Sequence, residues 1–109
     1  MSLTEWDEAS RDINVKQNEV PVVTLFTMPA CASCKRMEAV LADLAHEYGG
    51  EVAIGKCLAG EYRGDVPISS VPRVFITTSG KVFGEYGVIS ADKLRTEIDD
   101  AIMQMETAE

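Results

Sequence analysis

Proline and glycine are scarce in this chain of 109 residues, which has four of the first and eight of the second. Their scarcity, together with an apolar fraction of 46%, excludes a collagen-like or disordered protein. Three cysteines are too few, and odd in number, for the disulfide framework of a small secreted domain. No apolar run approaches the length of a membrane span, and the first seven residues lack the basic and apolar regions of a secretion signal. We therefore expect a protein of the reducing cytoplasm.

Basic residues are outnumbered by acidic ones. Lys and Arg total 10 and Asp and Glu total 18, which gives a net charge of -8. Such a charge repels phosphate, so neither a nucleic acid nor an anionic membrane is an expected partner. The length is that of one domain, and it suffices for a core that folds without a disulfide or a metal. We expect residues 1–109 to form one domain.

The amino-terminal segment, residues 1–19, is predicted to be helical. Thr4 and Asp7 are spaced as in a capping box, and the helix is expected to end near residue 17. A thin apolar face follows at helical spacing, formed by Leu3, Trp6, Ser10 and Ile13.

Residues 20–58 are predicted to form a βαβ unit. Residues 20–27 are nearly all β-branched or aromatic, which is typical of a strand buried on both faces. A second strand over residues 51–58 should run parallel to it, because a long helix separates the two. That helix has the clearest apolar stripe of the chain, formed by Met37, Val40, Leu41, Leu44, Ala45 and Tyr48.

Residues 59–70 are predicted to be a connecting loop, and residues 71–109 a ββα unit. Its hairpin turns at Ser79-Gly80, and Ser90 caps the last helix. The apolar stripe of that helix consists of Leu94, Ile98, Ala101, Ile102 and Met105. The order of elements predicts an α/β fold with a central mixed four-stranded sheet flanked by helices.

The strongest chemical signal is Cys31-Ala32-Ser33-Cys34, which follows the first strand and opens the long helix. Thiolate is the reactive form of cysteine, and the free N–H groups and dipole of a helix amino terminus stabilise an anion there. Cys31 should therefore be the more acidic and more exposed sulfur. Cys34 lies one helical turn deeper, close enough to form a disulfide with it. We predict that Cys31 attacks a substrate disulfide and that Cys34 resolves the mixed disulfide.

Zinc and iron-sulfur sites use the same cysteine spacing. The only other soft ligands are His46 and Cys57. His46 lies about 18 Å along the helix from Cys34, so the two cannot share an ion, and His46 is predicted to be a surface residue. Cys57 is predicted to be a small core residue. Two alternatives remain open: a non-catalytic scaffold, and an iron-sulfur cluster that bridges two chains through Cys31 and Cys34.

Val71 and Pro72 immediately precede the third predicted strand. Proline sits at the start of a strand, and a cis X–Pro bond turns the chain while it leaves the backbone groups of the preceding residue free. If Pro72 is cis and faces the cysteines, Val71 can pair with an extended substrate, as in β-augmentation. The alternative is an ordinary trans proline at the end of a loop.

From about Val20 onward these features resemble the thioredoxin superfamily. The resemblance rests on three sequence features: Pro29 to Cys34, the pair Val71-Pro72, and Gly87 ahead of the last helix. The resemblance implies a thioredoxin-like fold and a redox-active disulfide with no further cofactor and no metal.

The resemblance also implies roles for individual residues. Cys31 would be the nucleophile and Cys34 the resolving thiol. The candidate substrate-binding residues are Pro29, Ala30, Val71, Pro72 and Gly87.

Within the superfamily the signals are divided. Residues 25–29 and 71–76 resemble glutaredoxins, whereas residues 79–81 and 86–94 resemble thioredoxins. The Trp before the thioredoxin cysteines and the Pro between them are missing. Leu25 stands where thioredoxins have a buried Asp, so proton transfer from the resolving thiol needs water or another group. The glycine pair and Asp with which a glutaredoxin holds glutathione are also missing.

The sequence thus predicts a cytoplasmic protein-disulfide reductase that takes part in electron transport and redox homeostasis. A reductase is favoured over an oxidase because the expected compartment is reducing. We expect a monomer that meets its protein substrates transiently, with an upstream reductase or glutathione as electron donor.

Overall fold

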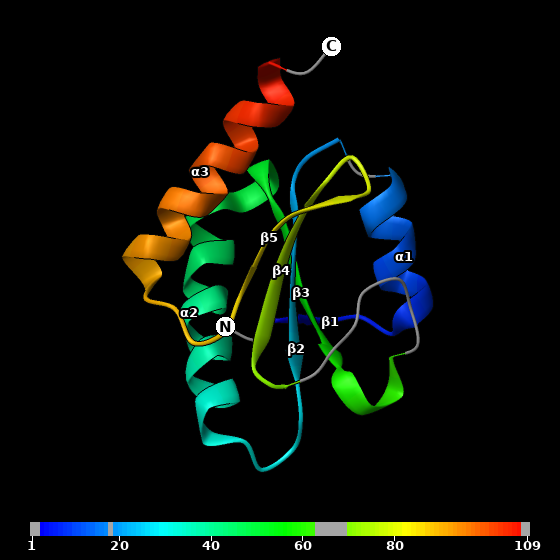
Figure 1. The fold of residues 1–109 in the computed structure, drawn as a ribbon, viewed down its shortest axis with the longest axis vertical. Coiled ribbons are helices and arrows are strands. Elements are labelled where there is room, and N and C mark those ends of the chain that lie inside the picture. The colour runs from blue at the N-terminus through cyan, green and yellow to red at the C-terminus, as the bar shows by residue number, and fades with distance from the viewer. Residues whose placement is uncertain (1–2, 18, 63–69, 108–109) are drawn as a thin grey trace.

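The structure is a computed structural model that describes residues 3–17, 19–62 and 70–107. In this part of the chain a sheet has the strand order β1-β3-β2-β4-β5 (Figure 1). The strands are β1 (Thr4–Glu5), β2 (Val22–Thr27), β3 (Ala53–Leu58), β4 (Arg73–Thr78) and β5 (Lys81–Tyr86). The helices are α1 (Glu8–Gln17), α2 (Ala32–Tyr48) and α3 (Ala91–Thr107), with 3-10 turns η1 (Gly49–Glu51) and η2 (Ala59–Glu61).

Helices cover both faces of the mixed sheet. Strands β1, β3 and β2 are parallel, and β4 is antiparallel to both β2 and β5. Helices α2 and α3 lie on one face and α1 lies on the other (Figure 1). The predicted α/β class and helix-flanked mixed sheet are confirmed. The predicted number of four strands is wrong, because β1 adds a fifth strand beside β3.

The amino-terminal segment is a strand followed by a helix, whereas a helix alone was expected. Thr4 lies in β1, and the helix begins only at Glu8. Asp7 accepts the backbone N–H of Ser10 at 2.8 Å, so Asp7 is a capping residue and Thr4 is not. No local sequence pattern predicts the pairing of β1 with β3. Because Thr4 and Glu5 form this strand, the helix begins later than expected, at Glu8.

The predicted apolar face of this helix is also wrong. Leu3 and Trp6 precede α1, and Ile13 is 56% exposed. The residues that α1 buries fully are Arg11 and Val15, one turn apart. Because one of these two buried residues is an arginine, the spacing of apolar residues does not reveal the buried face of α1.

Strand β2 is central, and all six of its residues are buried, as its β-branched and aromatic composition predicted. Val23 and Leu25 pack in the main core with α2 and α3. Phe26 packs in a second cluster with Cys57 and with other residues of the α1 face. The alternation of side chains along one strand therefore supplies both cores.

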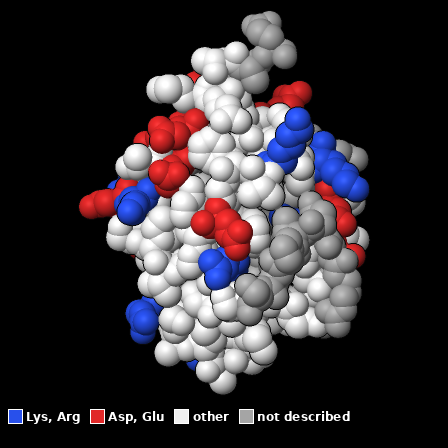
Figure 2. Space-filling model, in the orientation of Figure 1, with Lys and Arg blue, Asp and Glu red and all other residues white. Residues whose placement is uncertain are grey.

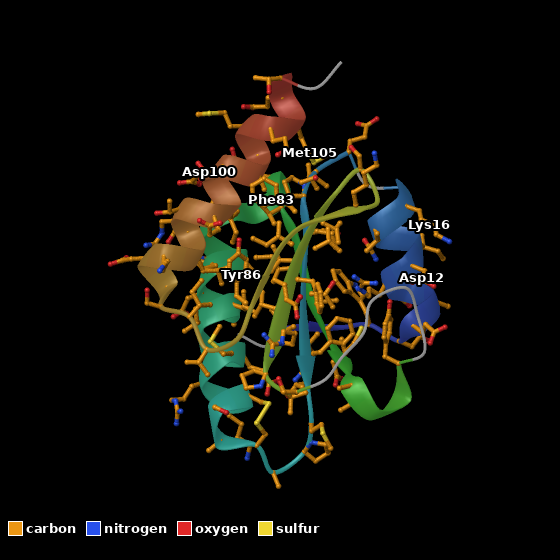
Figure 3. The ribbon with its side chains drawn as sticks, viewed as in Figure 1. Asp12, Lys16, Phe83, Tyr86, Asp100 and Met105 are labelled. Atoms are coloured by element: carbon orange, nitrogen blue, oxygen red, sulfur yellow. A yellow bond between two sulfur atoms is a disulfide. The ribbon has the colours of Figure 1, made fainter. Side chains whose placement is uncertain are left out.

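The predicted apolar stripes of α2 and α3 form the main core. The members that are buried are Met37, Leu41, Leu44, Tyr48, Leu94, Ile98 and Ala101. Phe83 and Tyr86 of β5 pack against this core, and Figure 3 shows both on the side of α2 and α3. Asp12 and Lys16 of α1 lie on the other side of the sheet (Figure 3).

The predicted turn and cap of the ββα unit are confirmed. Ser79 and Gly80 both have positive φ angles, 52° and 81°. Ser90 accepts the backbone N–H of Lys93 through Oγ at 3.2 Å. Of the predicted loop, residues 59–61 form η2 and residues 63–69 lie outside the described residues. No helix within the described ranges is long and apolar enough to cross a membrane.

Charged side chains are unevenly spread. On the face that Figure 2 shows, acidic side chains gather over α3. A second acidic group consists of Glu5, Asp7 and Glu8, at the turn between β1 and α1.

Candidate dithiol active site

Cys31 is the N-cap residue of α2, as the sequence predicted. Its backbone is extended, with φ -107° and ψ 108°, so that its side chain turns back over the first turn of the helix. The Cys31 Sγ accepts the backbone N–H of Cys34 at 3.2 Å and lies 3.5 Å from the Ser33 hydroxyl. The sulfur therefore lies where the helix dipole and unpaired N–H groups favour negative charge.

Cys34 forms a disulfide with Cys31, and their Cα atoms are 5.2 Å apart. The two sulfurs differ in exposure: Cys34 is completely buried and Cys31 is partly exposed. An incoming substrate can therefore approach Cys31 and not Cys34.

The turn between β2 and α2 presents Cys31 at the surface. Met28, Pro29 and Ala30 are all exposed, directly after the buried strand. Ala30 has a left-handed backbone with φ 59°, which reverses the chain toward the helix. Pro29 and Ala30, two of the predicted substrate-binding residues, therefore border Cys31 on an open surface.

The remaining predicted site residues lie at the same end of the sheet. The Val71–Pro72 peptide bond is cis, and Pro72 is buried. Strand β4 starts at Arg73, which pairs with Phe26 near the end of β2, so Pro72 precedes β4 beside the turn that carries Cys31. Gly87 follows β5 at this end too, because Tyr86 pairs with Val74 near the start of β4.

Leu25 is completely buried and supplies no group that could accept a proton from Cys34. A carboxylate lies nearby in the helix: Glu38 is one turn after Cys34 and forms an ion pair with Lys56 of β3. Both partners are about one quarter exposed, with 25% for Glu38 and 23% for Lys56. The sequence pattern did not reveal this pair, although the spacing of four residues from Cys34 is visible in it.

A pocket of about 630 Å³ lies at the carboxyl ends of the three parallel strands, and Pro29 and Ala30, which directly precede Cys31, are part of its lining. Ligand sites in open α/β sheets lie at that end of parallel strands. Its walls come from the turn after β1, the turn after β2, the last residues of β3 and the first turn of α2. Its lining includes the side chains of Glu5, Trp6, Asp7, Lys35 and Leu58.

Beneath this pocket lies a buried arginine that the sequence analysis missed. The Arg11 guanidinium donates to Thr24 Oγ1 at 3.1 Å and to Tyr62 Oη at 2.6 Å. Its Cζ lies 5.4 Å from the centre of the Phe26 ring and 5.3 Å from that of Tyr62. These contacts compensate for the burial of its charge.

Cys57 and His46 behave as predicted. Cys57 is 3% exposed, and burial raises the pKa of its thiol to about 11, although the nearby Arg11 charge acts in the opposite direction. His46 is exposed on α2. Among the described residues no group of three or more His, Cys, Asp and Glu side chains is placed to hold a metal ion.

Comparison with known proteins identifies relatives over most of the chain. The family model described as Thioredoxin matches residues 3–100. The chain is 36% identical over 70 residues to the chloroplastic M-type thioredoxin of Spinacia oleracea, with 62% of this chain and 39% of the relative covered. It is 33% identical to a probable thioredoxin-2 of Caenorhabditis elegans, over 81% of this chain and 63% of the relative. With the thioredoxin of Porphyra purpurea it shares 30% identity over 74% of this chain and 78% of the relative.

Solved structures agree on the fold. Mitochondrial thioredoxin 3 of Saccharomyces cerevisiae in its oxidized form superposes with a TM-score of 0.73 at 23% identity, over 90% of this chain and 94% of that one. A mutant thioredoxin from Halobacterium salinarum gives a TM-score of 0.73 at 22% identity, over 92% and 89%. The chain spans less than two thirds of the length of the first two relatives by sequence, 39% and 63%.

Proposed function

Because this chain belongs to the thioredoxin family, we propose that it is a thiol-disulfide oxidoreductase that reduces protein disulfides through Cys31 and Cys34. The observation that carries this proposal is the Cys31 sulfur at the start of α2, where it accepts a backbone N–H and is joined to the buried Cys34. One sulfur is open to a substrate and its partner is held directly behind it.

The reaction takes place in two exchanges. The Cys31 thiolate attacks one sulfur of the substrate disulfide, the substrate S–S bond breaks, and the first substrate thiol leaves with a proton from the solvent. Cys34 then loses its proton and attacks the Cys31 sulfur of the mixed disulfide, which releases the second substrate thiol. Two electrons pass to the substrate, and the protein is left with the Cys31–Cys34 disulfide.

The protein supplies position and electrostatics for these steps. The amino terminus of α2 stabilises the Cys31 thiolate, which is the attacking group of the first exchange. Glu38 follows Cys34 by one helical turn and fits the role of the group that accepts its proton, which Leu25 cannot fill. Val71, next to the cis bond, is suited to pair with the backbone of an extended substrate, and Pro29, Ala30 and Gly87 border the same end of the sheet.

The setting that fits this chemistry is the cytoplasm. A protein with three cysteines, one of them buried and free, suits a reducing compartment. In our proposal the protein acts as a monomer in electron transport and redox homeostasis. It meets its substrates transiently, and an upstream reductase or glutathione returns the disulfide to the dithiol.

The test is a disulfide-reduction assay with a thiol donor, which compares the wild type with Cys31→Ser, Cys34→Ser and, as matched control, Cys57→Ser. We expect the Cys31 variant to lose turnover, the Cys34 variant to accumulate a mixed disulfide detectable by mass, and the Cys57 variant to retain turnover. A wild type that reduces no disulfide with any competent donor contradicts the proposal. Visible absorbance of the purified protein that disappears in the Cys31 and Cys34 variants would point instead to an iron-sulfur cluster.

A further inference from the structure

The pocket at the carboxyl ends of the parallel strands adjoins the turn that carries Cys31. Pro29 and Ala30, which directly precede Cys31, line it together with Lys35, one turn after Cys31. These lining residues lie on both sides of Cys31 in the sequence, so the pocket borders the turn that carries the reacting sulfur.

The pocket has an aromatic wall that the fold holds in place. The backbone N–H of Trp6 donates to the backbone carbonyl of Lys56 at 2.8 Å, which ties the turn after β1 to β3. The Trp6 indole packs flat against Gly55, where a Cβ atom would come within 2.5 Å of the ring. Met28 and Leu58, which are 48% and 43% exposed, add apolar surface to the pocket. Indole faces attract organic cations, and the stems of Lys and Arg pack well on such apolar surface.

The charges of the pocket point to a cation as well. Its lining carries the carboxylates of Glu5, Asp7, Glu8 and Glu38 against the ammonium groups of Lys35 and Lys56, and the Arg11 guanidinium, bound to the lining residue Tyr62, adds a third positive charge. Lys56 and Glu38 neutralise each other in their ion pair. Asp7 carries a charge at neutral pH like any exposed Asp, and hydrogen bonds from Ser10 lower its pKa further. The remaining excess is negative, and the net charge of -8 adds a long-range field of the same sign.

From this arrangement we propose that the pocket is a specificity site for a basic side chain, Lys or Arg, that flanks the disulfide of a protein substrate. The inference rests on the proposed reductase function and names its preferred substrate class. The substrate cation lies against the Trp6 indole and faces the carboxylates of Glu5 and Asp7, while the adjacent disulfide contacts Cys31.

The experiment uses two disulfide-bridged peptides that are identical except for Lys or Glu beside one cysteine, and measures kcat/KM for each. For the wild type we expect the Lys peptide to be favoured about three- to tenfold, the range of one cation–aromatic contact with a neighbouring charge. The preference should decline as NaCl rises, because exposed charges are screened.

The test variant is Glu5→Gln combined with Asp7→Asn, in which Asn retains the capping hydrogen bond to α1. Its charge-matched control is Glu19→Gln combined with Glu51→Gln, two exposed residues that precede β2 and β3 at the opposite end of the sheet. We expect the Lys preference to fall to about half or less in the test variant and to be retained in the control. The ratio of the two peptides is the decisive number, because the loss of negative charge near Cys31 alters its reactivity toward both peptides alike.

The outcomes separate the two proposals. A wild type that reduces both peptides at equal rates, or a Lys preference that is as large in the Glu5/Asp7 variant as in the charge-matched control, overturns the specificity site and leaves the reductase function standing. A wild type that reduces neither peptide overturns the reductase function and the specificity site with it.

Discussion

The two faces of the sheet are built from the same strands but on different principles. On the α2/α3 face, Val23 and Leu25 meet the apolar stripes of two long helices, and the buried side chains there are almost all aliphatic. On the α1 face, Phe26 meets a cluster of aromatic rings and a thiol around the Arg11 guanidinium. The first face derives its stability from apolar area. The second depends on the hydrogen bonds and ring contacts of a buried charge, and the pocket lies next to it.

The largest effect should come from the aliphatic face. Leu41→Ala removes a completely buried side chain and leaves a cavity, so we expect the free energy of unfolding to fall by about 2–5 kcal/mol. Chemical denaturation of the oxidised protein measures it. The control is Ile13→Ala at a position that is 56% exposed, where the change should stay within about 0.5 kcal/mol. An unchanged midpoint for Leu41→Ala would show that this face is not the main core.

The α1 face should respond through its hydrogen bonds. Arg11→Ala removes the donor to Thr24 and Tyr62 and the packing on two rings, and we expect a loss of about 2–4 kcal/mol. In a double-mutant cycle with Tyr62→Phe, the two changes should couple by about 0.5–3 kcal/mol, because both break the same contact. Strict additivity would mean that the Arg11–Tyr62 hydrogen bond contributes nothing, and the contrast between the two faces would lose its basis.

A smaller effect belongs to the polar edge of the aliphatic face. Tyr86 Oη donates to Glu97 at 2.6 Å, so we expect Tyr86→Phe to cost about 0.5–1.5 kcal/mol in thermal or chemical unfolding. Tyr48→Phe is the comparison, since Tyr48 Oη donates to Asp99 at the same distance, 2.6 Å. Equal stability of wild type and both variants would contradict this assignment.

Tyr86 also predicts a pH dependence. Burial, followed by the hydrogen bond to Glu97, raises the pKa of Tyr86 above its ordinary value in the folded protein. Below the unfolded-state pKa of about 10 both states keep the phenol proton, and the contribution of Tyr86 is fully present. Above that pH the unfolded state ionises first, so stability falls as pH rises. We expect Tyr86→Phe to flatten the fall between about pH 10 and 12, measured as the melting temperature against pH. Parallel curves for the two proteins would contradict it.

The smallest effect should come from Glu38. Its ion pair with Lys56 is partly exposed, so Glu38→Gln should change stability by no more than about 1 kcal/mol. The same variant should slow the resolution of the mixed disulfide if Glu38 accepts the Cys34 proton, and stopped-flow measurement of that step separates the two roles. Resolution at the wild-type rate across pH would exclude Glu38 as the acceptor.

Much of the aliphatic face and of the dithiol turn could be predicted from the sequence, because local patterns determine both. The stripe from Met37 to Tyr48 has a helical period, and the position of Cys31 follows from a strand that ends and a helix that begins. The cis state of Pro72 was a conditional expectation, and the structure bears it out.

The α1 face could not be predicted in the same way, because tertiary contacts determine it. Strand β1 has two residues, Thr4 and Glu5, and exists only through its pairing with β3. Arg11 is a residue type that is almost never fully buried, and it becomes buried here because Thr24, Phe26 and Tyr62 converge on it from other elements. The ion pair of Glu38 with Lys56 likewise joins residues 18 positions apart.

Gly55 has a consequence for how this protein can change. Gly55 lies within β3 and contributes no side chain to the reaction. A Cβ atom at this position would clash with the Trp6 ring, so any larger residue would displace that ring. Such an exchange would reshape the entrance next to the reactive sulfur and leave both redox cysteines as they are. Substitution at this single position can therefore change which substrates the pocket binds without changing the cysteines that carry out the redox chemistry.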